Sequence, residues 1–273
     1  MGNPVQLYGP VLVFDSGIGG LSVLRQIRRL MPDLDAVYLA DDAAFPYGAW
    51  EEQALVRHIV KTMEEAINTW QPRAVVIACN TASTLVLPAL REHFDLPFIG
   101  TVPAIKPAAQ QTSSGLVSVL ATPGTVARDY TQELINQFAE GVDVKLVGAV
   151  SLAQLAEHKL EGEAVDLSLL QEEVLPCFVS KGSGKTDTVV LGCTHYPFLL
   201  DELKKVAPWP VNWIDPAPAI ARQLAKILGV KVQADPPRDE HALSASNHRL
   251  FYTSSQDVTE RKKEDLLRAI HGC

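Results

Sequence analysis

The amino-acid sequence predicts an α/β protein made of two similar parallel-sheet units. Short apolar segments alternate with amphipathic ones along almost the whole chain, and the apolar segments are continuous rather than interrupted at every second residue. Such strands are buried on both faces, which is typical of parallel sheets covered by helices on either side. A third observation is that the second half of the chain repeats the motif order of the first. A length of 273 residues allows one large domain or two small ones.

Each predicted strand is an apolar run that ends at a turn or a polar cluster. Strands are expected at residues 11–15, 36–40, 74–78, 116–121, 144–149, 188–192, 211–215 and 249–253. The intervening segments have the three-to-four-residue apolar spacing of helices. Helices are therefore expected at residues 20–30, 51–69, 84–93, 124–139, 152–158, 167–180, 197–206, 216–228 and 257–271. The polar stretch SKGSGKTD, at 180–187, is expected to be a surface loop.

The repeat between the two halves is carried by two special turns. VLVFDSGIGGLSVLRQ (11–26) aligns with VSVLATPGTVARDYTQ (117–132), and IACNTAST (77–84) aligns with LGCTHYPF (191–198). All parallel α/β units have similar apolar patterns, so the matching order of the polar turns is what favours a duplication. We expect a pseudo-symmetric pair of units, residues 1–97 with 208–273 and residues 98–207, with the active site in the cleft between them.

The composition excludes several classes of function. A net charge of −8 and a pI near 5.4 argue against a nucleic-acid or anionic-membrane partner, because backbone phosphates require a basic face. No uninterrupted apolar stretch approaches the roughly 18 residues that span a bilayer. The opening MGNPVQLYG lacks the basic and apolar regions of a secretory signal. We therefore expect a cytoplasmic protein with neither a nucleic-acid nor a membrane partner.

Four polar clusters follow predicted strands, where parallel sheets bind their ligands. They are Asp15-Ser16, Pro46-Tyr47-Gly48, Cys79-Asn80-Thr81 and Cys193-Thr194-His195. A helical segment follows each of the two cysteines, and a helix N-terminus favours a thiolate over a thiol. The neighbouring amide and hydroxyl groups are donors that suit a carboxylate. The pattern indicates an anionic substrate that is bound beside two acid/base thiols.

Several other interpretations of these clusters remain open at this point. DSGIGG (15–20) could be a phosphate loop or a purely structural turn, but its spacing matches neither nucleotide motif, no Lys-Ser/Thr follows, and Asp15 would repel phosphate. Cys79, Cys193 and His195 could hold zinc, although this spacing is a weak metal signature. Cysteine–histidine hydrolysis would leave one cysteine unused. A non-catalytic amino-acid-binding protein would need no paired thiols.

The remaining cysteines and histidines are expected to have no chemical role. Cys177 lies in an apolar context and Cys273 is the last residue, and free thiols usually behave as small hydrophobic side chains. The other histidines lie on polar or amphipathic segments and are expected to be solvated: His58, His93, His158, His241, His248 and His271.

Seven stretches of the sequence resemble the glutamate racemase family, within the aspartate/glutamate racemase superfamily. In chain order they are VFDSGIGGLSVL, FPYG, ACNTAS, TVPA, ATPGTV, LGCTHYPFL and IDPA, which span residues 13–217. ACNTAS together with GCTHYP is the specific part, because an aspartate racemase is expected to differ at the histidine after the second cysteine. An aspartate racemase, or a related isomerase or decarboxylase of diacids, is the alternative within the superfamily.

The resemblance implies a cofactor-independent and metal-free racemisation of glutamate, which supplies D-glutamate for peptidoglycan. Cys79 and Cys193 would be the two acid/base residues, with Asp15 tuning the first and His195 tuning the second. The substrate site would be lined by Asp15, Ser16, Tyr47, Gly48, Asn80, Thr81, Thr194 and His195. A looser alignment adds Glu157, since family members often carry an acidic residue in this segment.

Two positions depart from the family pattern. The family commonly has basic residues where Ala44 precedes FPYG and where Trp50 follows it. Both bear on the entrance to the site and on partner contacts more than on the chemistry. The resemblance therefore allows a homodimer without fixing its geometry, and it does not fix regulation.

Overall fold

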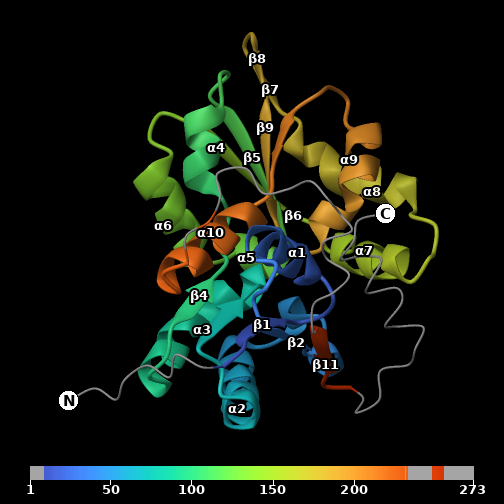
Figure 1. Cartoon of the computed structure of the whole chain (residues 1–273). Helices are drawn as coiled ribbons and strands as arrows, with labels where there is room; N and C mark the ends of the chain where they lie inside the picture. Colours follow the sequence, from blue (N-terminus) through green and yellow to red (C-terminus); the bar gives the residue numbers. More distant parts are fainter. Residues whose placement is uncertain (1–8, 231, 233–247, 255–273) are drawn as a thin grey trace. The chain divides into compact units, whose positions relative to one another are not determined.

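The computed structural model describes residues 9–230, 232 and 248–254 (Figure 1). The chain forms two compact units, Met1–Thr101 with Ala217–Cys273 and Val102–Pro216. Each unit contains its own parallel sheet, and helices pack against that sheet.

The first unit contains a five-stranded parallel sheet in the order β11-β2-β1-β3-β4. The strands are β1 (Val11–Asp15), β2 (Ala36–Ala40), β3 (Ala74–Ile77), β4 (Phe98–Gly100) and β11 (His248–Tyr252). Every residue of β1, β2 and β3 is buried, which explains their unbroken apolar sequence.

The helices of the first unit pack in two pairs. They are α1 (Leu21–Leu30), α2 (Glu52–Trp70), α3 (Asn80–His93) and α10 (Ala217–Ile227). Helix α1 packs against α10, and α2 packs against α3. Leu12 and Phe14 of β1 share a core with α2 and α3, and successive strand residues point to opposite faces. The loop between β2 and α2 holds two short 3₁₀ turns, η1 (Asp42–Ala44) and η2 (Tyr47–Ala49).

The second unit contains a four-stranded parallel sheet in the order β10-β9-β5-β6. The strands are β5 (Leu116–Ala121), β6 (Asp143–Gly148), β9 (Thr188–Gly192) and β10 (Asn212–Ile214). Two cores flank the sheet. The helices are α4 (Ile105–Gln111), α5 (Pro123–Val126), α6 (Asp129–Phe138), α7 (Leu152–Leu160), α8 (Leu167–Val174) and α9 (Leu200–Val206), with 3₁₀ turns η3 (Leu175–Cys177) and η4 (Tyr196–Leu199).

The two sheets have the same strand order, which confirms two similar parallel units. Numbered along the chain, the first four strands of unit one are β1 to β4, and those of unit two are β5, β6, β9 and β10. In both sheets the spatial order is second, first, third, fourth, and β11 adds an edge strand beside β2 in the first unit. Strands β3 and β9, which precede the two cysteine motifs, are therefore equivalent third strands.

The boundaries between the units lie later in the chain than the expected 97/98 and 207/208. Strand β4 pairs with β3, which puts residues 98–100 in the first unit. Strand β10 pairs with β9, which puts residues 212–214 in the second. Strand β4 and helix α4 had not been predicted, and the expected surface loop at 180–187 contains a small antiparallel hairpin of β7 (Ser180–Lys181) and β8 (Gly184–Lys185).

Helix boundaries differ from the prediction at four places. Helix α3 begins at Asn80, directly after Cys79, rather than at residue 84. The expected helix 124–139 is two helices, because Arg128 has an extended backbone. The expected helices 167–180 and 197–206 each contain a 3₁₀ turn beside a proline. The expected helix 257–271 lies outside the described residues.

None of the helices within the described ranges combines the length and the apolar character needed to cross a bilayer.

Candidate active site

Cys79 lies at the junction between β3 and α3 in the first unit. It is the N-cap of α3, with a non-helical backbone, and its carbonyl accepts a hydrogen bond from Ser83 N. The residue is 6% exposed, and its sulfur lies 3.7 Å from the hydroxyl oxygen of Ser16. The first turn of α3 leaves its backbone N–H groups directed towards this end of the helix, which favours a thiolate.

Asp15 is the last residue of β1, the strand next to β3, and Ser16 follows it directly. Asp15 is fully buried, and its carboxylate accepts a hydrogen bond from Gly17 N at 3.1 Å. Gly20, the last glycine of DSGIGG, has a steric reason: a Cβ there would lie 2.8 Å from Asp15 Cβ and 2.9 Å from Tyr38 Oη. The turn therefore brings the start of α1 tightly against the end of β1.

Asn80 carries a buried side-chain amide that has no hydrogen-bond partner within the described part of the chain. The residue is 2% exposed, and among the described residues neither its Nδ2 nor its Oδ1 meets a hydrogen-bond partner. A buried polar group that stays unpaired costs about 1–3 kcal/mol, so such groups usually have a function. Thr81 beside it is also buried. The helix start therefore presents a donor and an acceptor next to the Cys79 thiol.

The loop after β2 brings Tyr47 and Gly48 to the same unit. Tyr47 is 2% exposed and its hydroxyl donates to Asp41 Oδ2 at 2.5 Å, while Gly48 is exposed. Burial raises the pKa of Tyr47 well above its ordinary value, and the negative charges of Asp41, Cys79 and Asp15 raise it further. The Tyr47 side chain is therefore a neutral phenol near neutral pH.

Cys193 occupies the equivalent place after β9 in the second unit. It is 7% exposed, and its sulfur lies 3.7 Å from Nδ1 of His195. Thr194 between them is buried. Gly192 precedes the thiol because a Cβ there would lie 2.8 Å from Ala121 Cβ on the neighbouring strand.

His195 connects the Cys193 thiol to Glu157 of helix α7. Nε2 of His195 lies 2.7 Å from Glu157 Oε1, and the two side chains are 2% and 19% exposed. Burial alone would lower the pKa of His195, but its hydrogen bonds to Cys193 and Glu157, together with their charges, raise the pKa well above its ordinary value. His195 is therefore an imidazolium that donates to Glu157 and faces the sulfur with its other nitrogen.

The predicted site residues thus gather in two groups, one per unit. Asp15, Ser16, Tyr47, Gly48, Cys79, Asn80 and Thr81 belong to the first unit, and Glu157, Cys193, Thr194 and His195 belong to the second. Cys177 is fully buried, and burial raises its pKa to about 12, which keeps it a thiol. Cys273 lies outside the described residues.

The sequence-based prediction missed Asp41 and was wrong about His58. Nε2 of His58 lies 2.6 Å from Asp41 Oδ2, so this histidine is paired rather than simply solvated. A signal was present: the acidic Asp41 directly follows the buried strand β2, much as Asp15 ends the buried strand β1. His93 is exposed, and His158 is 42% exposed beside Glu163. His241, His271 and the side chain of His248 lie outside the described part of the chain.

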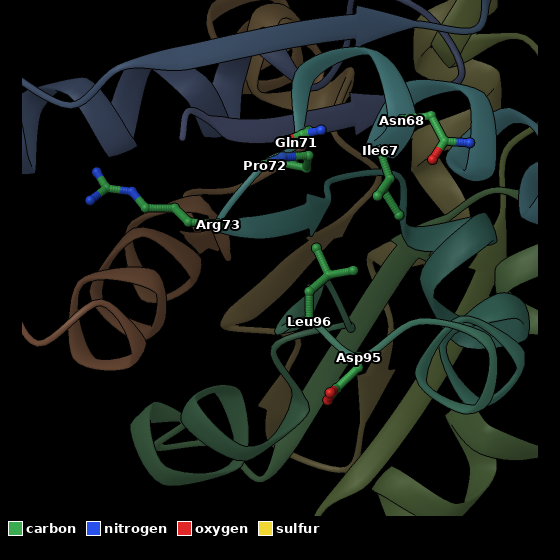
Figure 2. Close-up of a pocket in the computed structure, with 7 residues that line it drawn as sticks. All are labelled: Ile67, Asn68, Gln71, Pro72, Arg73, Asp95 and Leu96. Carbon is green, nitrogen blue, oxygen red and sulfur yellow. The ribbon is translucent and has the colours of Figure 1, made fainter. Parts of the chain in front are cut away.

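The candidate site residues of the described chain form no metal-binding cluster, and one pocket of the first unit lies away from them. Within residues 9–230, 232 and 248–254, no cluster of three or more His, Cys, Asp or Glu side chains could hold a metal ion. A pocket of about 280 Å³ lies where α2 ends and β3 begins, at the opposite end of the strand from Cys79. Figure 2 shows Ile67 and Leu96 pointing towards each other across it, while Arg73 extends away.

Comparisons with known proteins decide which family this arrangement belongs to. The family model described as Asp/Glu/hydantoin racemase matches residues 17–224. The chain belongs to the Asp/Glu/hydantoin racemase family. The resemblance seen in the motifs is thereby confirmed, and the chain is an enzyme of the racemase class.

Individual relatives in this family are named glutamate racemases. The protein of Brucella ovis is 54% identical over 90% of this chain and 87% of its own length. The protein of Brucella anthropi is 59% identical over 80% of this chain and 79% of its own length. The crystal structure of Escherichia coli glutamate racemase, in complex with L-glutamate and the activator UDP-MurNAc-ala, is 41% identical, covers 96% of both chains and has a TM-score of 0.83.

Proposed function

We propose that this chain interconverts L- and D-glutamate without a cofactor, using Cys79 and Cys193 as two acid/base groups. One observation carries the proposal. Two buried thiols follow the equivalent third strands of two similar units, and each has a polar side chain at 3.7 Å. The names of the relatives, and the L-glutamate bound to the E. coli enzyme, support glutamate as the substrate.

The reaction needs two proton transfers at one carbon. One cysteine, as a thiolate, takes the α-proton and becomes a thiol, and the electron pair of the C–H bond stays on the α-carbon. The other cysteine, as a thiol, gives its proton to the opposite face and becomes a thiolate. A single base would return the proton to the face it left, so inversion requires both thiols to reach the same α-carbon.

The substrate carboxylates require donors, because the carbanion forms beside a carboxylate and is stabilised by preorganised hydrogen bonds. Asn80 supports this role most directly, since its buried amide has no partner among the described residues. Thr81 and Thr194 are buried beside the two thiols. We assign these three residues, with Asp15, Ser16, Tyr47, Gly48 and His195, to the substrate site.

Optical activity tests the function directly. Purified protein is incubated with each enantiomer of glutamate, aspartate and glutamine, and the rotation or circular dichroism is followed. Loss of the signal with glutamate alone is the expected result. Faster loss with aspartate would favour an aspartate racemase, and binding without any loss would favour an amino-acid-binding protein.

Isotope incorporation tests the two-base mechanism separately. In deuterated water, the D-glutamate formed at low conversion from protiated L-glutamate is expected to carry deuterium at the α-carbon. The recovered L-glutamate is expected to stay mostly protiated, because the abstracting thiol and the donating thiol are different groups. Mass spectrometry reads both, and substantial protium in the first D-glutamate would refute the two-thiol model.

The proposed product fits a role in peptidoglycan synthesis, for which the glutamate racemase family supplies D-glutamate. The enzyme would act in the cytoplasm. A homodimer is compatible with this function, and analytical ultracentrifugation of the purified protein would establish its oligomeric state.

A further inference from the structure

Asp41 is a buried carboxylate that receives three side-chain donors. It follows β2 directly, is 1% exposed, and its backbone N–H donates to the carbonyl of Asp15 at 2.8 Å. Tyr47 Oη and His58 Nε2 meet its Oδ2 at 2.5 and 2.6 Å. Thr253 Oγ1 donates to its Oδ1 at 2.7 Å. A carboxylate only accepts, so Nε2 of His58 must carry the hydrogen.

Trp50 covers this cluster from the far end of the same loop. Its indole N–H donates to the carbonyl of Ala44 at 2.9 Å, and its ring centre lies 5.0 Å from that of His58. Trp50 as a whole residue is 37% exposed, and the His58 side chain is 31% exposed.

The chain beyond β11 holds the other side of the loop. Thr253 Oγ1 accepts a hydrogen bond from Ala43 N at 3.2 Å while it donates to Asp41. Ser254 N donates to Asp42 Oδ1 at 3.0 Å, and the Ser254 hydroxyl bonds the other oxygen of the same carboxylate. The loop forms two short 3₁₀ turns of its own, and these side-chain bonds attach it to the chain beyond β11.

We propose that Asp41 and His58, with Trp50 over them, are positioning residues that hold the Tyr47–Gly48 loop in its substrate-binding shape. This inference rests on the proposed function, in which Tyr47 and Gly48 meet the substrate. The Asp41 carboxylate takes the single hydroxyl hydrogen of Tyr47, so the phenol oxygen can only accept a hydrogen bond from the substrate or from water. His58 donates a second hydrogen bond to Asp41 Oδ2, the oxygen that also accepts from Tyr47. This second bond limits how far the Asp41 carboxylate can rotate.

Substitutions at Asp41 and His58 separate positioning from simple packing. Asp41→Asn keeps the shape but leaves one oxygen for three donors, so at least one bond is lost. His58→Gln keeps an N–H donor, whereas His58→Leu keeps bulk without a donor. We expect Asp41→Asn and His58→Leu to raise the KM for glutamate about tenfold with kcat within about threefold, since one lost hydrogen bond to a charged group has this order of effect. His58→Gln is expected to stay near the wild-type KM.

His93→Leu is the matched control, because His93 is exposed on α3 and contacts the ring of Phe94. Its kinetics are expected to be unchanged. Equal KM values for His58→Gln and His58→Leu, or a wild-type KM for a folded Asp41→Asn, would overturn the proposal. Circular dichroism and thermal unfolding establish that each variant is folded.

A readout without turnover keeps this test distinct from that of the proposed function. In protein labelled with [4-¹³C]tyrosine, the Tyr47 signal is assigned among the six tyrosines by its loss in Tyr47→Phe. We expect this signal to shift in Asp41→Asn and His58→Leu, and not in His93→Leu. An unshifted signal would overturn the positioning role whatever the activity. If the variants shift as expected but the wild-type protein does not racemise glutamate, only the proposed function is overturned.

Discussion

Replacing Glu157 by Gln removes the charge behind His195 while keeping an acceptor for its Nε2–H. Hydrogen bonds to charged groups contribute about 1.5–3 kcal/mol, and one pKa unit corresponds to about 1.36 kcal/mol. The pKa of His195, now held well above its ordinary value in part by Glu157, should therefore fall. An imidazolium stabilises a neighbouring thiolate, so kcat/KM should fall about tenfold to a hundredfold.

Isotope effects can show which of the two proton-transfer steps the Glu157→Gln substitution slows. The equilibrium constant between enantiomers is one, so kcat/KM must fall equally from L- and from D-glutamate. The weakened step is proton transfer at Cys193, so the primary isotope effect should rise more for the α-deuterated enantiomer whose hydron Cys193 removes. Glutamate deuterated at the α-carbon, in each configuration, supplies the measurement.

Glu163→Gln is the matched control for this substitution. Glu163 lies 3.6 Å from His158, but the two side chains are 62% and 42% exposed, and water screens such pairs almost completely. Its kinetics should not change. A kcat/KM of Glu157→Gln within twofold of wild type, or an equal loss in Glu163→Gln, would refute the role given to Glu157.

Two further predictions concern the thiols and the stability of the second unit. Cys79→Ser and Cys193→Ser should each abolish racemisation while glutamate still binds, because a hydroxyl is too weak an acid to replace a thiol. Cys177→Ser is the control and should keep the wild-type turnover. Near-normal turnover in Cys79→Ser or Cys193→Ser would contradict the mechanism. Burial alone would raise the pKa of Asp187, but hydrogen bonds from Thr112, Ser113, Ser114 and Thr188 hold it at about 2. The stability it contributes is present above its unfolded value of 3.8 and is lost as pH falls through about 2. Asp187→Asn should therefore unfold more easily at neutral pH, by about 1 kcal/mol for a partly exposed carboxylate, and denaturant titrations should show this difference vanishing towards pH 2.

The fold class could be predicted because strands that are buried on both faces have continuous apolar sequences. Strands β1 and β3 are fully buried, so nothing polar interrupts them until the rim of the sheet. Strand β4 was not predicted: it has three residues, and so short a segment gives no period that distinguishes a strand from a loop. Helix α3 begins four residues earlier than expected because the polar residues Asn80 and Thr81 lie inside its first turn, where polarity looks like a loop.

The site was predictable to the extent that its residues are neighbours in sequence. Ser16 follows a strand end, and His195 lies two residues from Cys193. The contacts of Glu157 and His58 are tertiary: Glu157 meets His195 across 38 residues, and His58 meets Asp41 across 17. An amphipathic helix with a histidine or a glutamate on its surface gives no signal of such a partner, so only the fold could show that His58 is paired.

The two thiols occupy equivalent places but have unequal neighbours, and the proposed reaction explains what that inequality must achieve. After each turnover the thiolate has moved from one cysteine to the other, so both protonation states must have similar free energies for the enzyme to work in both directions. Cys79 faces the neutral hydroxyl of Ser16, whereas Cys193 faces the imidazolium of His195. Glu157 at 2.7 Å holds the imidazolium in place and keeps it protonated, so that a thiolate on Cys193 reaches a free energy similar to that of a thiolate on Cys79. On this reasoning, removing His195 and Glu157 together, as His195→Asn with Glu157→Gln, should cost less than the sum of the two single changes, because each single change leaves one buried charge without its partner. A double-mutant cycle on kcat/KM measures this coupling, and strictly additive losses would show that the two residues act independently.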